Sequence, residues 1–253
     1  MRLLKAFALS AALFASAPAL AAGGAPPPPN ANFSFNSLFG TIDRASAQRG
    51  FQVYKEVCSA CHAMRQLSYR NLMDLGLTEA QVREIAATFT VTDGPNDEGQ
   101  MFERPGRVPD RFRRPFPNEQ AARSANNGAY PPDLSVMTKA RNDGANYLHA
   151  LLTGYADPPA GMTMMDGMNY NRWFPGFQIA MPNVLNEDQI EYVDGTKATV
   201  DQMARDVTTF LAWAAEPEME TRRAMGVKVL IFLTILGGLT YAVKRKVWAD
   251  VKH

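Results

Sequence analysis

The only two cysteines of this 253-residue chain lie three positions apart and are followed at once by a histidine, in the sequence Cys58-Ser59-Ala60-Cys61-His62. This cluster constrains the fold strongly, because any group bound there must contact three side chains that project from one short segment. The spacing fits three kinds of site: a redox disulfide, half of a zinc site, or the attachment point of a c-type haem.

Two of these alternatives use the motif incompletely. A structural zinc site needs four ligands and a catalytic one at least three. Besides His62 the sequence offers only His149 and His253, so carboxylates would have to complete the set. A redox pair gives His62 no role and normally accompanies a βαβ pattern, which is missing. Haem attachment uses both thiols in thioether bonds and the histidine as an axial ligand. We therefore favour a haem and keep a metal or redox pair as the alternative.

The first 22 residues have the three regions of a secretory signal peptide. Arg2 and Lys5 form a positive start, residues 6–14 are apolar, and Ala19-Leu20-Ala21 is a small-residue cleavage site. The alternative is a membrane helix, which Pro18 disfavours. The predicted destination of residues 23–224 is the bacterial periplasm, where haem is attached after export.

A second apolar segment lies near the C-terminus. Residues 225–243 contain a single charge, Lys228, and are long enough to cross a membrane. The basic residues 244–246 follow directly, as is typical of the cytoplasmic side. A buried soluble helix is the alternative, but such a helix rarely lacks a polar face. We predict that residues 225–243 form one transmembrane helix in the bacterial inner (plasma) membrane. Residues 244–253 are predicted to form a cytoplasmic tail.

The small net charge of +1 hides an uneven distribution. Residues 23–224 carry 19 Lys and Arg against 24 Asp and Glu, a net charge of −5. An acidic exported domain favours a basic partner and argues against nucleic-acid binding. Solubility alone accounts for this charge equally well.

Helix-start signals predict a mainly α domain. Asp43 precedes a helix that leads to Cys58, and an apolar helix face over 147–152 ends at Gly154. The pairs Thr78 with Gln81 and Thr199 with Gln202 are capping boxes. A short helix is expected between Asn118 and Gly128, and Pro217 is expected in the first turn of the last helix.

The remaining segments predict loops and small β pieces. The Asp194-Gly195 turn is expected to join two short strands over 191–196. Residues 90–117 and 154–186 are rich in Gly, Pro and polar groups and show no periodicity. Loops of this length in a compact domain are usually functional or disordered.

An electron-carrying haem needs a second axial ligand. Met181 is the favoured residue, because it lies in the apolar, proline-stiffened segment FPGFQIAMPN. The alternatives are His149 and a methionine cluster in a glycine-rich, mobile setting: Met162, Met164, Met165 and Met168.

Longer segments of the sequence resemble one family. CSACHAMRQLSYRNL, TDGPNDEGQMFERPGRVPDRFRRPFPN and AARSANNGAYPPDLS are followed by LLTGY, FPGFQIAMP, DVTTFLAWAAEPE and RRAMGVKVL. Their order and spacing are similar to those of the cytochrome c1 family, the c-haem subunits of the cytochrome bc1 complex (ubiquinol–cytochrome c oxidoreductase, respiratory complex III). The likeness covers nearly the whole chain after the signal peptide and is of the bacterial type.

The resemblance implies a c-type haem domain with long loops, anchored by one C-terminal helix. It implies one covalent haem c that accepts an electron from the Rieske iron–sulfur protein and passes it to a soluble or tethered cytochrome c. Cytochrome b is the other partner, and no catalytic residue lies on this chain. His62 and Met181 are the implied metal ligands, and Cys58 and Cys61 the attachment points.

The same resemblance implies a set of pocket residues. Arg141 and Tyr147 would face a propionate of the haem, since buried carboxylates need charge-assisted partners. The other implied pocket residues are Asn126, Pro131, Pro132, Leu151 and Phe174.

Acidic residues in the first long loop are candidates for docking a basic cytochrome c: Asp93, Asp97, Glu98 and Glu103. A solvated charged loop is the alternative. The nearby residues Arg111, Arg113 and Arg114 would oppose docking if they share its face.

Three other functions compete with a subunit of a membrane complex. A free-standing anchored cytochrome c shuttle would have a flexible linker before its anchor. A haem enzyme would keep its iron open and place an acid–base pair nearby. A zinc-binding structural protein would need more ligands than the sequence supplies.

Overall fold

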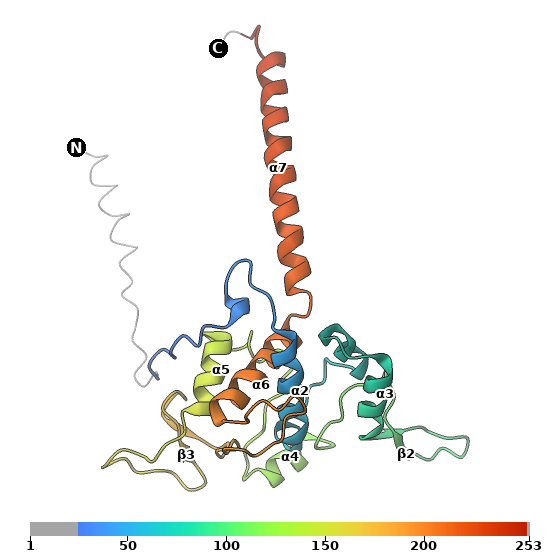
Figure 1. The fold of residues 1–253 in the computed structure, drawn as a ribbon, viewed down its shortest axis with the longest axis vertical. Coiled ribbons are helices and arrows are strands. Elements are labelled where there is room, and N and C mark those ends of the chain that lie inside the picture. The colour runs from blue at the N-terminus through green and yellow to red at the C-terminus, as the bar shows by residue number, and fades with distance from the viewer. Residues whose placement is uncertain (1–24, 252–253) are drawn as a thin grey trace, which may run out of the picture.

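The computed structural model describes residues 25–251, so the predicted signal peptide and His253 lie outside the described residues. Figure 1 shows a helical domain from which one long helix projects. The helices are α2 (Arg44–Glu56), α3 (Glu79–Ala87), α4 (Glu119–Ala125), α5 (Gly144–Thr153), α6 (Val200–Ala215) and α7 (Met219–Val247). Short 3-10 helices are η2 (Ser34–Asn36), η3 (Cys58–Ala60) and η4 (Tyr69–Leu75). The mainly α prediction is confirmed.

Two small antiparallel sheets complete the domain. β1 (Thr90–Asp93) pairs with β2 (Phe102–Pro105), and Thr90 lies opposite Pro105. β3 (Asn169–Tyr170) pairs with β4 (Gln178–Ile179). Both hairpins extend from the end of the domain that is remote from α7 (Figure 1).

The core lies between α2, α5 and α6, and α2 packs most extensively against α6. The ring of Phe210 on α6 lies 5.7 Å from that of Phe51 and 5.8 Å from that of Tyr54, both on α2. Burying each such ring contributes about 1.5–3 kcal/mol. Gly50 lets the two backbones approach closely, because a Cβ there would lie 2.0 Å from the carbonyl oxygen of Asp206.

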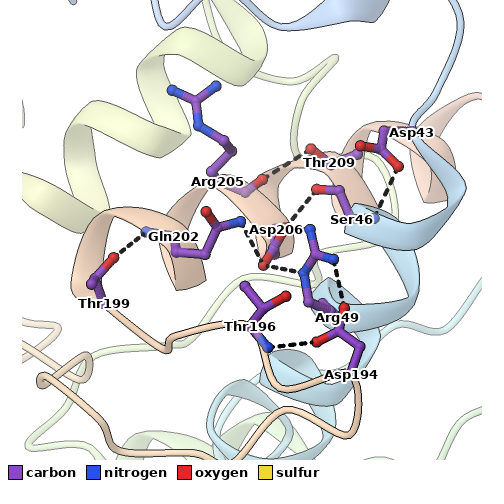
Figure 2. A network of polar contacts seen from close by, with 10 residues as sticks. All are labelled: Asp43, Ser46, Arg49, Asp194, Thr196, Thr199, Gln202, Arg205, Asp206 and Thr209. Carbon is purple, nitrogen blue, oxygen red and sulfur yellow. Dashed lines mark hydrogen bonds and ion pairs between the residues drawn. The ribbon is translucent and has the colours of Figure 1, made fainter.

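A buried carboxylate fixes the register of these two helices (Figure 2). Asp206 on α6 is fully buried. Its carboxylate accepts from Ser46 Oγ at 2.6 Å and from the Arg49 guanidinium at 2.9 and 3.1 Å, both residues on α2. Gln202 Nε2 donates a further bond at 3.0 Å. Arg49 also reaches Asp194 at 2.9 Å, so the network joins α2, α6 and the loop before α6.

The capping signals predict helix starts well. Asp43 accepts from Ser46 N, and Asn118 accepts from Ala121 N. The reciprocal box of Thr78 and Gln81 is complete. At α6 only half of the predicted box forms: the Thr199 hydroxyl accepts from Gln202 N. The Gln202 side chain turns instead to Asp206, because a buried carboxylate demands donors more strongly than an exposed helix end.

The prediction of two short strands over residues 191–196 was wrong, because the strands lie elsewhere in the chain. The turn at Asp194-Gly195 exists, with Gly195 N donating to Tyr192 O, but residues 191–196 form no strand. Asp194 accepts a hydrogen bond from Thr196 N and pairs with Arg49, and these contacts direct the chain toward α2. Val193 is 98% exposed and has no strand beside it. The strands lie instead inside the two stretches that lack periodicity.

The final helix, α7, has 29 residues and starts later than predicted. Glu218 is its N-cap, so Pro217 lies just before the helix rather than in its first turn. It is the one helix among residues 25–251 long and apolar enough to cross a membrane, and its most apolar window is not buried by the rest of the chain. At about 1.5 Å per residue it exceeds a hydrocarbon core of roughly 30 Å.

Replacing Asp206 by Ala should lower the free energy of unfolding by about 3–5 kcal/mol, because Arg49 keeps its charge and loses its buried partner. Denaturant unfolding of the detergent-solubilised protein, followed by circular dichroism, measures this. The control is Glu79→Ala, which breaks the exposed pair with Arg83 and should cost no more than about 0.5 kcal/mol. Equal effects of the two changes would contradict a special role for the Asp206 network.

Candidate functional site

The Cys–His motif forms a single tight turn at the end of α2. After Val57 the chain enters η3, where Cys61 N and His62 N both donate to the carbonyl oxygen of Cys58, at 3.1 and 2.9 Å. Ser59 Oγ donates to Lys55 O at 2.7 Å and ties the turn to the last turn of α2. Both thiols and the imidazole therefore project from one short, well-anchored segment.

The two thiols are unpaired and half-buried. Burial raises the pKa of Cys58 to about 12, and the neighbouring Cys61 adds to the rise. Redox-active C-x-x-C pairs have the opposite property, a lowered thiol pKa. Among residues 25–251, no group of three or more His, Cys, Asp and Glu side chains is arranged to hold a metal ion. These observations disfavour the redox and zinc alternatives.

His62 is held in the form that a metal ligand requires. Its Nδ1 lies 2.8 Å from the carbonyl oxygen of Pro132. A carbonyl only accepts, so Nδ1 carries the proton and the lone pair of Nε2 is left for coordination. Burial lowers the pKa of His62, which keeps the imidazole neutral. Pro132, predicted as a pocket residue, thus acts through His62.

The segment 130–135 lies against the Cys–His turn along its length. Leu134 N donates to Ala63 O at 2.9 Å, and the backbone N of Arg65 donates to Asp133 Oδ2 at 2.9 Å. A small cleft that opens to solvent adjoins Cys61, and Pro131 is part of its wall. The predicted residues Pro131 and Pro132 are therefore brought to the motif.

A second group of predicted residues gathers at α5. Arg141 is exposed, and its positive charge acts on the half-buried phenol of Tyr147, whose pKa burial raises. The Tyr147 phenol in turn contributes to the raised pKa of Tyr155. Tyr147 thus lies within electrostatic reach of both Arg141 and Tyr155.

Tyr155 connects this group to the predicted methionine. Its hydroxyl donates to the carbonyl oxygen of Met181 at 3.0 Å, and Asn169 Nδ2 donates to the same oxygen at 3.4 Å. Met181 follows directly on the β3–β4 hairpin and is half-buried. The backbone at Met181 is therefore fixed from two sides, as a loop that delivers a ligand requires.

Asn171 organises the rest of this loop. It is fully buried, and its Nδ2 donates to the carbonyl oxygen of Leu151 at the end of α5, at 2.8 Å. Its Oδ1 accepts from Trp173 N, and its backbone N donates to Phe177 O. This places the predicted pocket residue Leu151 beside the loop that contains the predicted residue Phe174.

The alternative ligands have other surroundings. His149 on α5 is buried, its ring packs edge-on against Phe33, and its Nε2 lies 2.9 Å from Asp201 Oδ1 on α6. On α5 it is offset from both Tyr147 and Leu151 by two positions, so it points away from their face. In the methionine cluster, Met165 is 59% exposed.

Whether these residues fit a haem is decided by their exposure. Asn126, at the end of α4, donates from Nδ2 to Ala122 O at 2.7 Å and is half-buried. Most of the predicted site residues share this intermediate exposure: Cys58, Cys61, His62, Asn126, Pro131, Tyr147, Leu151, Phe174 and Met181. Thiols, an imidazole with a free Nε2 and a wall of half-covered apolar groups fit a covalently attached macrocycle. Between described residues, no hydrogen bond joins the Met181 loop directly to the His62 turn.

The acidic loop proves to be the β1–β2 hairpin. Arg104 binds the carboxylate of Asp93 and reaches Asp110 at 2.6 and 3.0 Å. This ion pairing lowers the pKa of Asp93 and compensates its charge. The exposed residues Asp97, Glu98 and Glu103 have no ion pair among the described residues, and they remain available at the surface.

Sequence reasoning missed Tyr155, Asn171 and Arg104. Each acts on residues distant along the chain, such as Met181 for Tyr155 and Leu151 for Asn171. The one local signal was the run of polar and aromatic residues inside a segment without periodicity.

Comparison with known proteins identifies the family. The model of the cytochrome C1 family matches residues 33–251. "Cytochrome c1 2, heme protein, mitochondrial" of Arabidopsis thaliana is 52% identical over 225 residues, 88% of this chain and 73% of the relative. "Cytochrome b-c1 complex catalytic subunit, mitochondrial" of Candida albicans is 49% identical over 227 residues, 89% of this chain and 79% of the relative. The bacterial "Cytochrome b/c1" of Bradyrhizobium diazoefficiens is 47% identical over 249 residues, 90% of this chain but 36% of the relative. The chain belongs to the cytochrome c1 family.

Proposed function

We propose that this chain is the electron-transfer subunit of a cytochrome b-c1 complex, whose covalent haem c accepts an electron from the Rieske iron–sulfur protein and passes it to a periplasmic cytochrome c. The observation that carries the proposal is the Cys58–His62 turn, in which Pro132 holds His62 with Nε2 free beside two unpaired thiols. Relatives named as heme proteins and as a b-c1 complex subunit support it.

The haem is held by four side chains in this proposal. Cys58 and Cys61 would form the two thioethers, and His62 and Met181 would hold the iron. Bound in this way, a haem supplies one-electron redox chemistry at an iron with no open position. Pro132 fixes the ring of His62, and Tyr155 fixes the backbone of Met181.

The remaining pocket residues orient the haem and exclude water. Arg141 and Tyr147 face a propionate, which they stabilise as charge-assisted partners. Support comes from the electrostatic contact between the two side chains. The walls are formed by Asn126, Pro131, Pro132, Leu151 and Phe174, and most of these are half-covered by protein.

The proposed topology follows the sequence boundaries. Residues 1–22 are a signal peptide, and 23–224 are the haem domain in the periplasm. Residues 225–243 cross the bacterial inner membrane, and 244–253 form the cytoplasmic tail. The basic residues Lys244, Arg245 and Lys246 in the last turns of α7 support this orientation.

The link between domain and anchor disfavours a free-standing shuttle. Only Glu216-Pro217-Glu218 separates α6 from α7. Arg222 Nε donates to Glu216 at 2.6 Å, and Lys139 lies 3.2 Å from the same carboxylate. A connection this short, held by Arg222 and Lys139, supports a subunit whose haem domain is fixed relative to α7 and is approached by its partners.

Both thiols should be bound to haem by thioether bonds. Denaturing electrophoresis with haem staining should then show a coloured band at the mature size, and acid–acetone extraction should leave the haem on the protein. Changing both Cys58 and Cys61 to Ala should abolish the stain. Release of all haem by acid–acetone from the unmodified chain would overturn the attachment.

Replacing Met181 by Leu should lower the redox potential of the haem, because a neutral thioether favours ferrous iron. For a one-electron couple, each loss of about 59 mV in the redox potential shifts the electron-transfer equilibrium tenfold. The iron should also bind carbon monoxide, which the unmodified protein should resist. Potentiometric titration with optical spectra measures both effects.

The matched control for this ligand is Met165→Leu, at the exposed residue of the methionine cluster, which should change neither potential nor carbon monoxide binding. Should Met181→Leu leave spectrum and potential unaltered, the axial assignment would have to move to another residue.

The free acids of the β1–β2 hairpin should attract a basic cytochrome c. Changing Asp97 and Glu98 to Lys should slow electron delivery mainly at low salt, since charges are screened beyond about 10 Å at 0.1 M. Stopped-flow kinetics across ionic strengths measures this. The control is Asp93→Asn, whose charge Arg104 already compensates. Equal rates for the Lys variant and the unmodified chain at every salt concentration would leave the hairpin as ordinary surface.

A further inference from the structure

Two large apolar side chains stand out from the domain beside the base of α7. Leu38 is 73% exposed and Phe39 is 78% exposed. They form the tip of the loop between η2 and α2, and we call them the Leu38–Phe39 tip. The flanking residues Phe35 and Ile42 are buried in the core. Single exposed apolar residues are ordinary, but an adjacent Leu–Phe pair on a fixed loop requires an explanation.

The loop is held by an arginine of α7. The Arg223 guanidinium donates to three backbone carbonyls: those of Ser37 and Gly40 at 2.9 Å each, and that of Phe35 at 3.0 Å. These carbonyls lie on both sides of the tip. The Leu38–Phe39 tip is therefore fixed relative to α7 rather than mobile at the end of a free loop.

A glutamate one turn earlier on α7 holds the rest of the loop. Glu220 accepts from Ile42 N at 2.8 Å and from the Arg44 guanidinium at 3.2 and 3.1 Å. Glu220 and Arg223 are three positions apart and so share one face of α7. Through these two residues, that face of α7 binds the chain from Phe35 to Arg44.

The loop backbone is itself closed tightly. Ser34 Oγ donates to Thr41 O at 2.7 Å, and Gly40 N donates to Ser37 O at 3.1 Å. A Cβ on Gly40 would lie 1.8 Å from the carbonyl oxygen of Ser34, so only glycine fits there. Because the loop is closed so compactly, the side chains of Leu38 and Phe39 do not fit inside it and point outward.

The position of the tip along α7 points to its partner. Figure 1 shows the loop rising above the domain beside the base of α7. Arg223 lies two residues before the apolar segment 225–243, at the level where α7 would enter a bilayer. Aromatic and apolar side chains with neighbouring arginines are typical of the membrane–water interface. The arginine stem also tolerates that environment.

We propose that the Leu38–Phe39 tip inserts into the outer interface of the bilayer that α7 crosses, with lipid as its partner. This inference rests on the proposed membrane crossing of α7. Because the tip stands to the side of α7, it supplies a second point of contact. Two points of contact fix the tilt of the haem domain over the membrane, which one helix alone leaves free.

The test places a nitroxide spin label at residue 39 by Phe39→Cys in the full haem-loaded chain. Cys58 and Cys61 are held in thioethers, so the new thiol is the one that reacts. The labelled protein is reconstituted in vesicles of phosphatidylcholine and phosphatidylglycerol, without other subunits. Collision with oxygen, which partitions into lipid, is compared with collision with a water-soluble nickel chelate. Leu38→Cys is the second reporter position.

Two further labels serve as controls. Met101→Cys, at an exposed residue of the β1–β2 hairpin, reports water, because that hairpin lies far from α7 in Figure 1. Leu236→Cys, in the middle of the apolar segment, reports hydrocarbon if α7 crosses. The oxygen-to-nickel ratio should be several-fold higher at residues 38 and 39 than at residue 101.

The outcomes separate the two levels of inference. A ratio at residues 38 and 39 equal to that at residue 101, with Leu236 in hydrocarbon, would overturn lipid insertion and leave the crossing intact. The tip would then be a protein contact. A water-like ratio at Leu236 would overturn the crossing and the inference together.

Discussion

The contact between α2 and α6 is the constraint on which the rest of the structure depends. α2 ends in the Cys58–His62 turn, and α6 leads through Pro217 into α7. Gly50 brings the two backbones together, and the buried Asp206 accepts from both Ser46 and Arg49. An unpaired buried charge costs several kcal/mol, so the register in which both donors reach Asp206 is strongly favoured over a shifted one. One interface thus sets the position of His62 relative to α7.

The α6–α7 junction extends this rigidity to the base of α7. Glu216 is braced by Lys139 and Arg222, while Glu220 and Arg223 hold the loop that precedes α2. A haem attached at the Cys–His turn would then keep a fixed position relative to α7. Exposed acids lie at the β1–β2 hairpin, on the end of the domain remote from α7 (Figure 1).

The parts of the fold predicted from sequence are those whose cause is local. Asp43, Thr78 and Asn118 cap helices through backbone groups three residues away, so their pattern is legible in the chain. The Cys–His turn is equally local. The misplaced strands have two to four residues, too few for a period-2 pattern to emerge. Tyr155 and Asn171 escaped prediction because their hydrogen bonds span 26 and 20 residues, and no short-range pattern reports such a partner.

The half-buried state of the site links cofactor binding to folding. Leu151, Phe174 and Met181 lie on segments joined by Asn171 and Tyr155, yet their side chains stay partly uncovered by protein. A macrocycle that covers them completes an apolar surface that the chain cannot complete alone. Any group that binds the folded state alone stabilises it, and a covalent bond makes the stabilisation independent of free haem concentration. The thioethers at Cys58 and Cys61 would thus make the haem a permanent part of the core, and α2 and the methionine loop would be coupled through it.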